Sequence, residues 1–362
     1  MLRYGWVVLE FDGGALHFLR WGGGNSLGVT SFYYLHCHKF PKKFFYKPAC
    51  ARVIIIELIV RVQLFFVYYN VNNPNNMVEK LSKNVHKIFL SGAYNEIAVL
   101  SDLHWDNPKC DRVLLKKHLD YCLDKKIPVV ITGDLFCLMQ GRGDNRRNKS
   151  DILPEHNNFK YLDSIVETAV EWFTPYASIL TVIGYGNHET GIIKWQETDI
   201  LQRFVDLLNM TTGSSVFTGG YGGWIVYDIH LRSNVKTSFK HKYFHGSGGG
   251  GIVTKGAINL TRALETYEGF DMFTMGHIHE NSCRNDSRET LHINAANVEI
   301  RLKQIHHCIT GTYKEEYEDG SHGWHVERGA PPKPLGGRII MISAKREKDI
   351  VYKSIDSKGF PL

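Results

Sequence analysis

The chain has 362 residues, of which 43% are apolar, and its formal net charge is +6. That length and apolar content can bury a substantial core, as one large domain or two small ones, which excludes a disordered protein. Residues 1–76 hold eight Lys or Arg and only three Asp or Glu, which leaves residues 77–362 nearly neutral with 35 basic and 34 acidic side chains. The positive net charge of the whole chain comes almost entirely from residues 1–76. It therefore does not imply a nucleic-acid partner.

Residues 1–76 differ from the rest of the chain, because they contain 16 aromatic side chains and show little helical or alternating periodicity. An asparagine-rich stretch then leads to Met77, which is predicted to be the biological start of the protein. On that hypothesis residues 1–76 are an untranslated or poorly ordered extension, and residues 77–362 form a single domain. The intact mass of the natively expressed protein tests this, since a product beginning at Met1 would contradict it.

A membrane anchor is the competing interpretation of this extension, since the apolar runs 53–56 and 64–67 lie close together. No uninterrupted apolar run reaches the ~18 residues that a spanning helix needs. Four residues break the stretch, namely Arg52, Glu57, Arg61 and Gln63. The sequence thus contains no convincing membrane segment and no secretory signal pattern, and it predicts a cytoplasmic protein.

Seven cysteines are scattered along the chain, and none belongs to a Cys-x-x-Cys pair. An odd and dispersed set is not typical of a disulfide framework, and thiolate zinc sites usually use closely spaced pairs. The sequence therefore predicts neither. The residues are Cys37, Cys50, Cys110, Cys122, Cys137, Cys283 and Cys308.

From about residue 85 short apolar runs alternate with amphipathic stretches, which is the pattern of an α/β protein. Helical periodicity is clearest between Leu162 and Phe173, where apolar residues recur at i, i+3, i+4, i+7 and i+11. The order strand, helix, strand in the first half predicts parallel pairing, whereas the second half favours antiparallel strands. The predicted strands are 97–100, 128–132, 179–183, 224–229, 239–244 and 272–275, and the predicted helices lie around 115–122, 162–173, 201–208 and 257–267.

Residues able to bind metals follow five of these strands. Polar side chains placed just past the carboxyl ends of strands converge on one crevice in α/β sheets. Each segment alone is weak evidence, because an Asp there is often a helix cap and a single His is more often structural, but five in this order are hard to obtain by accident. The segments are Ser-Asp-Leu-His at 101–104, Gly-Asp at 133–134, Gly-Asn-His-Glu at 186–189, Phe-His-Gly at 244–246 and Gly-His-Ile-His at 276–279.

These segments resemble the ligand motifs of the calcineurin-like metallophosphoesterase superfamily, D-x-H, G-D, G-N-H-(D/E), H and G-H-x-H, over residues 95–280. The resemblance implies an α/β fold, a two-sheet sandwich of mixed parallel and antiparallel strands flanked by helices, with residues 281–362 adding C-terminal strands. It also implies a dinuclear metal centre with Asp134 as the bridge. One metal is expected on Asp102, His104, Asp134 and His279, and the other on Asp134, Asn187, His245 and His277.

The chemistry of this ligand set is consistent with two divalent cations. Carboxylates and imidazoles without thiolate suit Mn, Fe or Zn, and one carboxylate can bridge cations ~3.5–4 Å apart. Two such cations lower the pKa of a shared water, and the resulting hydroxide can attack phosphorus without a protein nucleophile. In the resembling enzymes the histidine equivalent to His188 contacts the phosphate or protonates the leaving oxygen, so His188 is predicted to be the general acid. Three glycines precede ligands at turns where φ > 0 is expected, namely Gly133, Gly186 and Gly276.

The chain departs from the serine/threonine phosphatases of this superfamily beside two motifs. Cys137 and Leu138 stand where those enzymes have an Asp that orients the catalytic His and an Arg that binds phosphate. Tyr185 replaces a second Arg just before the third motif. The loss of both arginines argues against a protein phosphatase. It also leaves the orienting partner of His188 open between Asp144 and a substrate oxygen.

Two loops near the predicted centre are candidates for phosphate binding. Residues 141–149 form a basic loop that either grips phosphates or is a solvated surface, with Arg142, Arg146, Arg147 and Lys149 as its cations. The glycine-rich run 246–251 is either an anion cradle of backbone N–H groups or a flexible access segment. Four further histidines, His306, His307, His322 and His325, are not expected to be ligands because both metals are already satisfied.

Together these features predict a phosphodiesterase or nuclease, with nucleic acid as a candidate substrate. A phosphomonoesterase acting on nucleotides or phosphoproteins is the alternative. A scaffold that keeps the fold only for partner binding is the third interpretation, but such a protein is expected to lose ligands. The chain also resembles uncharacterised phosphoesterases encoded by bacteriophages, and for such a viral protein the expected compartment is the host cytoplasm.

Overall fold

The computed structural model describes residues 77–140 and 151–361, apart from the pairs 233–234, 295–296, 322–323 and 348–349, together with three strands before residue 77. The chain divides into two units, Met1–Asn73 and Pro74–Leu362. The first unit contains an antiparallel sheet of β1 (Gly5–Asp12), β2 (Ala15–Trp21) and β3 (Phe32–His36). Translation from Met77 stays a prediction.

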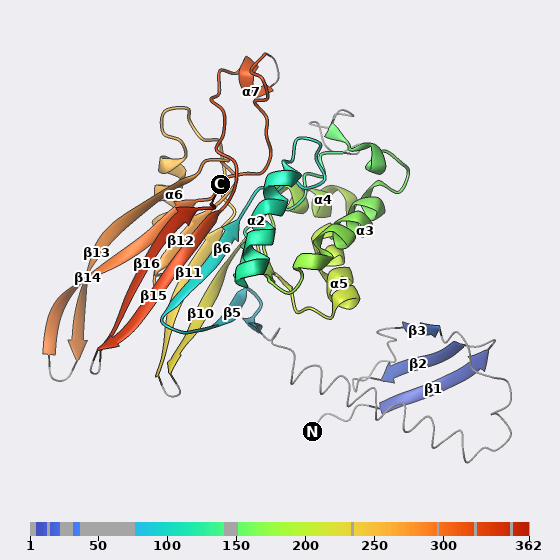
Figure 1. The fold of residues 1–362 in the computed structure, drawn as a ribbon, viewed down its shortest axis with the longest axis horizontal. Coiled ribbons are helices and arrows are strands. Elements are labelled where there is room, and N and C mark those ends of the chain that lie inside the picture. Colours follow the sequence, from blue (N-terminus) through green and yellow to red (C-terminus); the bar gives the residue numbers. More distant parts are fainter. Residues whose placement is uncertain are drawn as a thin grey trace. The chain divides into compact units, whose positions relative to one another are not determined.

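Two mixed sheets make up the second unit (Figure 1). The six-stranded sheet has the order β16-β15-β6-β7-β8-β9, and its strands β6 to β9 pair in parallel, as the strand, helix, strand order predicts. These strands are β6 (Tyr94–Leu100), β7 (Val129–Ile131), β8 (Leu180–Ile183), β9 (Phe217–Thr218), β15 (Arg338–Glu347) and β16 (Ile350–Gly359).

The seven-stranded sheet has the order β13-β14-β12-β11-β10-β5-β4. Its parallel pairs are β5 with β10, β11 with β12, and β12 with β14, and the remaining neighbours are antiparallel. The strands are β4 (Val78–Ser82), β5 (Val85–Ser91), β10 (Gly222–Arg232), β11 (Val235–Phe244), β12 (Met272–Met275), β13 (Ser282–Asn294) and β14 (Asn297–Ile309).

Alternating side chains of β6 connect two hydrophobic cores. Ile97 and Val99 belong to the core between the sheets, whereas Ala98 and Leu100 belong to the core beneath the helices, and all four are fully buried. Three helices, α2 (Arg112–Lys125), α3 (Tyr161–Phe173) and α5 (Ile200–Thr212), pack on that outer face. A further helix, α6 (Ala257–Leu264), packs with β12 and β14 on the opposite sheet. The predicted two-sheet sandwich flanked by helices is therefore confirmed (Figure 1).

The remaining helices show where the sequence pattern was incomplete. Helix α4 (Asn187–Gln196) begins at a candidate ligand and was not predicted. Helix α6 ends at Leu264, three residues earlier than expected. The short elements are α7 (Trp324–Glu327) and the 3₁₀ turns η2 (Pro154–His156) and η3 (Thr174–Tyr176).

Strands β13 and β14 form a long hairpin at the edge of the seven-stranded sheet, and a disulfide joins Cys283 to Cys308 across it. The prediction against disulfides is wrong for this pair. The two cysteines are separated by 25 positions in the sequence, and only the register of the hairpin places them opposite each other. Cys110, Cys122 and Cys137 are free and buried.

Membrane-spanning segments can be assessed only in the part of the chain that the structure describes. There, no helix has both the length and the apolar character needed to cross a membrane. The apolar runs 53–56 and 64–67, on which the alternative of a membrane anchor rested, lie outside the described residues.

Candidate metal centre

Eight predicted site residues meet at one edge of the sandwich, past the carboxyl ends of five strands. Asp102 and His104 follow β6, Asp134 follows β7, and Asn187 and His188 follow β8 and open helix α4. The other three come from the second sheet, with His245 after β11 and His277 and His279 after β12. The convergence expected from the strand order is therefore present in the folded chain.

The side chains gather into two groups. In the first, ligand atoms of Asp102, His104 and His279 lie within 4.8 Å of one another. His279 Nε2 is 3.3 Å from His104 Nε2 and 3.3 Å from Asp102 Oδ1. Three ligand atoms that face one another at such distances could bind the same cation.

The second group contains Asp134, His245 and His277, whose ligand atoms also lie within 4.8 Å of one another. His245 Nε2 is 3.2 Å from Asp134 Oδ2 and 3.2 Å from Asn187 Oδ1. The structure thus brings together the side chains expected for the second metal. Asp134 belongs to this group, and its expected role as a bridge to the first metal stays a prediction.

Five of these residues have a left-handed backbone, a conformation that is uncommon for residues other than glycine. Their φ angles are 52° at Asp102, 48° at His104, 49° at Asp134, 69° at His277 and 58° at His279. Such conformations persist only where the surrounding structure enforces them, and they concentrate at functional sites. A left-handed backbone destabilises the turn in which it occurs. Its presence at five candidate ligands is evidence that the positions of these side chains matter more than the stability of the turns.

Hydrogen bonds from the backbone to the two carboxylates help to hold these turns. Asp102 Oδ2 accepts from the N–H of His277 at 2.8 Å, and Asp134 Oδ1 accepts from the N–H of His188 at 3.0 Å. Each carboxylate is therefore fixed by one oxygen and has the other oxygen free to face the imidazoles. The arrangement joins the two sheets, since Asp102 follows β6 and His277 follows β12.

Three glycines directly precede ligands, and each was expected to have a positive φ. At two of the three positions, glycine is required for a different reason. Only Gly133 has a positive φ, of +117°. At Gly186 an added Cβ would lie 1.9 Å from Asp134 Oδ1, and at Gly276 it would lie 2.0 Å from Ser101 Oγ. Gly186 and Gly276 are thus required by close approach to the neighbouring loop and not by a left-handed turn.

Electrostatics in the centre favour anionic carboxylates and at least one neutral imidazole. Burial alone would raise the pKa of Asp134, but His245 and His188 hold it well below its ordinary value. The pKa of Asp102 is likewise lowered, because His279 and His245 outweigh the effect of burial. For His104, burial and the nearby charge of His188 place the pKa well below its ordinary value. Its ring is therefore neutral and has a nitrogen lone pair that can bind a metal.

The carboxylate, amide and imidazole side chains of this site are suitable ligands for a pair of divalent cations. Asp102 Oδ1 is buried and makes no hydrogen bond, although His279 Nε2 is close, so one anionic oxygen lacks a full partner. A buried charge without compensation is unfavourable, and a cation held by the carboxylate and neutral imidazoles would supply the missing charge. Asn187, His277 and His279 are only half-buried, which leaves one side of the centre accessible.

Among the described residues, the backbone carbonyl of Cys137 is a hydrogen-bond partner of His188 and accepts from its Nδ1. Asp144 lies outside the described residues, so its expected role, or that of a substrate oxygen, in orienting His188 stays a prediction. Since a carbonyl can only accept, Nδ1 carries a proton and Nε2 faces Asp134 Oδ2 at 3.8 Å. Burial raises the pKa of the Cys137 thiol to about 12, so Cys137 is not an acid that replaces the missing Asp.

Sequence reasoning assigned no role to two buried acids that shape the ligand loops. Asp106 accepts from the backbone N–H groups of Cys137 and Leu138, the latter at 3.0 Å. Glu189 accepts from the N–H groups of three residues in the loops after β7 and β8. The sequence signals for Glu189 were its place in the third motif and its position three residues after Gly186, where a capping box places an acid.

Other predicted residues lie away from the centre or beyond what is described. The basic loop residues Arg142, Arg146, Arg147 and Lys149 lie outside the described residues, as does His322. His306 and His307 belong to β14. His325 pairs with Glu316 at 3.4 Å, and the same carboxylate is 3.8 Å from His279 Nδ1. The glycine-rich run 246–251 links His245 to the turn before α6. Its role stays open between an anion cradle and a flexible access segment.

Comparisons with known proteins give no family assignment. No family model and no curated protein matches the sequence. Among solved structures, the chain is similar to Vacuolar Protein Sorting 29 from Cryptosporidium parvum, with 12% identity, coverage of 74% of this chain and 99% of that chain, and a TM-score of 0.26. For GAP50, the anchor in the inner membrane complex of Plasmodium, the identity is 11%, the coverage 73% and 84%, and the TM-score 0.33.

A conserved uncharacterized protein of Streptococcus pneumoniae, described as a predicted phosphoesterase, is 13% identical, with coverage of 74% of this chain and 90% of that chain and a TM-score of 0.26. TM-scores this low carry no argument about activity. The resemblance to phage-encoded phosphoesterases stays a prediction.

Proposed function

We propose that the chain is a dinuclear metal-dependent phosphoesterase of the calcineurin-like kind. The observation that carries the proposal is the meeting of two ligand groups, Asp102, His104 and His279 with Asp134, His245 and His277, at one edge of the sandwich. Five of these six residues have a positive φ, an uncommon conformation that concentrates at functional sites. Asn187 completes the second group, and Asp134 is proposed as the bridge.

The reaction follows from the ligand chemistry and from the orientation of His188. When bound, two divalent cations activate a water and neutralise charge on phosphate oxygens. The Cys137 carbonyl holds the Nδ1 proton of His188, which leaves Nε2 as the atom that can exchange a proton with the leaving oxygen. The half-buried side of the centre gives the phosphoester access to this histidine.

A diester or nucleic-acid substrate is proposed over a monoester, because the two arginines that clamp phosphate in the phosphatases are absent. Tyr185 does not replace the second arginine, since its hydroxyl donates to Asp199 Oδ2 at 2.7 Å. A monoesterase remains the alternative. Turnover of bis-p-nitrophenyl phosphate and p-nitrophenyl phosphate under Mn²⁺ ranks the two, and assays with DNA, RNA and cyclic nucleotides then identify the substrate class.

Metal analysis separates an enzyme from a scaffold with the same fold. The purified chain is expected to bind two equivalents of Mn²⁺, Fe²⁺ or Zn²⁺ and to hydrolyse at least one of the two chromogenic esters. A chain that takes up no transition metal and cleaves neither ester would contradict the proposal and favour the scaffold. Loss of the metals to a chelator and recovery on adding Mn²⁺ would tie the activity to the centre.

Substitutions separate the role of His188 from that of the ligands. His188→Gln should lower kcat by about 10²- to 10⁴-fold while metal content stays the same, because only proton transfer is lost. Asp134→Asn should lower both metal content and activity. His230→Gln, at a partly exposed position in β10, is the control and should change neither. Equal activity of His188→Gln and the parent chain would remove His188 from the mechanism.

A further inference from the structure

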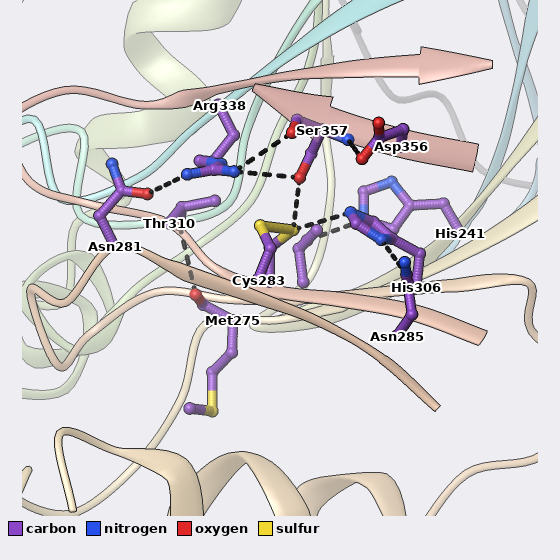
Figure 2. Close-up of a disulfide and its surroundings, with 12 residues drawn as sticks. His241, Met275, Asn281, Cys283, Asn285, His306, Thr310, Arg338, Asp356 and Ser357 are labelled. Atoms are coloured by element: carbon purple, nitrogen blue, oxygen red, sulfur yellow. Dashed lines mark hydrogen bonds between the residues drawn. A yellow bond between two sulfur atoms is a disulfide. The ribbon is translucent and has the colours of Figure 1, made fainter. Parts of the chain in front are cut away.

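A second group of metal-binding atoms lies in the β13–β14 hairpin, apart from the candidate centre. Ligand atoms of Cys283, His306 and Cys308 lie within 4.8 Å of one another. Cys283 is directly opposite Cys308, and His306 precedes Cys308 by two positions, on the same face of β14. Figure 2 shows the disulfide and His306 side by side, facing Ser357 of β16.

The imidazole of His306 is oriented as a ligand. Its Nδ1 hydrogen-bonds to Asn285 Oδ1 at 2.6 Å, and its Nε2 lies 3.2 Å from Cys308 Sγ. The amide oxygen accepts the Nδ1 proton, so Nε2 presents its lone pair to the sulfurs. A histidine that binds a metal usually donates its other N–H in this way, which fixes the ring. Burial lowers the pKa of His306 to about 4, so the ring is neutral at neutral pH.

We propose that reduction of the Cys283–Cys308 disulfide converts this cluster into a binding site for a thiophilic divalent cation, of which Zn²⁺ is the representative. Two thiolates and the His306 imidazole would be the protein ligands, a soft set unlike the carboxylate-rich centre. Ser357 Oγ, 3.6 Å from Cys308 Sγ and bonded to Arg338 Nη2 at 3.1 Å, or a water completes four ligands.

The proposed conversion balances in electrons, protons and charge. Two equivalents of a small thiol give two electrons and two protons to the sulfur–sulfur bond and leave as their own disulfide. Each cysteine then loses one proton on binding the cation. A divalent cation with two thiolates and a neutral imidazole has no net charge, which suits a cluster whose Cys308 and His306 are both buried.

Co²⁺ is the probe, because a bond between cobalt and thiolate gives charge-transfer absorption in the near ultraviolet. The full chain is reduced with a phosphine, desalted without oxygen and titrated with Co²⁺, in parallel with the oxidised chain. The reduced chain should show the band, saturate at one more Co²⁺ per chain and lose the band when Zn²⁺ is added. The oxidised chain keeps the thiols of Cys110, Cys122 and Cys137, so it controls for these described cysteines.

Adjacent histidines of β14 provide a matched pair of variants. His307 faces the opposite side of the strand, where its Nε2 is 3.2 Å from Asp286. His306→Gln should weaken Co²⁺ binding by about tenfold or more, and His307→Gln should leave it unchanged. The absence of the band in the reduced chain, or its persistence in the double variant Cys283→Ser/Cys308→Ser, would overturn the proposal. Equal Co²⁺ affinities of the two histidine variants would also overturn it.

Discussion

Glu189 ties two ligand-bearing loops together without being a candidate ligand. Its Oε2 accepts from the N–H of Asp134 at 3.2 Å and from that of Gly186 at 2.8 Å, while Oε1 accepts from the N–H of Phe136 at 2.9 Å. The donors lie in the loops after β7 and β8, and the carboxyl is almost completely buried. One side chain therefore stabilises the turns that aim ligands from two strands.

Replacing this acid by its amide tests that role. Glu189→Gln puts an NH₂ group where one oxygen accepted a hydrogen bond, so at least one buried N–H loses its acceptor at a cost of about 1–3 kcal/mol. The free energy of unfolding should fall by that amount in urea titrations, and Mn²⁺ binding should weaken because the ligand loops loosen. Glu197→Gln, at the exposed end of the same helix, is the matched control. Equal effects of the two substitutions would contradict the role of Glu189.

The candidate ligands were accessible to sequence reasoning because their chemistry resides in residue type and in position after an apolar run. The partner of His188 was not accessible, because a backbone carbonyl leaves no trace in the sequence. The Cys283–Cys308 pair was missed for a related reason, since strand register alone makes the two residues neighbours. Left-handed backbone was expected at three glycines beside the ligands, whereas in the structure one of these glycines and five of the Asp and His ligands themselves have a positive φ.

At the scale of elements, helix α5 is joined to the loop that carries Asn187 and His188. Asp199 is the N-cap of α5, where its Oδ1 accepts from the N–H of Gln202 at 2.9 Å. Its other oxygen accepts from the hydroxyl of Tyr185 at 2.7 Å. One carboxylate thus caps a helix and anchors the end of β8 just before the ligands begin.

Removing this cap should loosen both elements. Asp199→Ala is expected to lower the free energy of unfolding by about 1–2 kcal/mol, since a helix cap and a hydroxyl partner are lost. Tyr185→Phe removes only the hydroxyl and should cost less. Because both substitutions break the same hydrogen bond, the double variant should be more stable than the sum of the single effects predicts. Strictly additive losses in urea titrations would show that the bond contributes nothing.

The elements that sequence reasoning found are those with unbroken patterns. Strand β7 is a short apolar run buried on both faces, and α3 and α5 have clear apolar stripes. Helix α4 was missed because it contains Gly191 and buries few apolar side chains, so it has no periodic apolar pattern. The start of this helix is marked by the cap that Glu189 forms. Strand β5 was hidden because a histidine, His86, occupies one of its fully buried positions.

For the whole molecule, the layers could be predicted but the order of strands could not. The order depends on pairings between remote segments, such as β5 beside β10, with Val85 opposite Trp224, and β6 beside β15, with Ala98 opposite Ile339. Local patterns say which faces are apolar and nothing about which distant strand will cover them. These pairings bring β11 and β12 to the edge where β6, β7 and β8 end, and so complete the candidate centre.

Three buried histidines, two in the seven-stranded sheet and one in helix α2, make the stability of the second unit depend on pH. Burial, reinforced by a nearby lysine in each case, lowers the pKa of His86 and His118 to about 4 and that of His241 to about 3, from 6.5. Between pH 6.5 and 4 the unfolded chain therefore binds more protons at these positions than the folded chain does. The free energy of unfolding must fall as the pH falls through this window.

The loss should be about 3 kcal/mol for His86 and for His118 and about 5 kcal/mol for His241 once the pH has passed the folded pKa of each. Urea titrations at a series of pH values measure how steeply the free energy of unfolding changes with pH. His118→Gln should reduce this slope between pH 6.5 and 4, because a neutral amide takes up no proton. His292→Gln, at an exposed position of β13, should leave the slope as it is. The baseline stability of His118→Gln is immaterial, since its hydrogen bond to Tyr313 is lost at every pH while proton uptake changes only the slope. A slope that His118→Gln leaves intact would mean that this ring is already protonated in the folded chain.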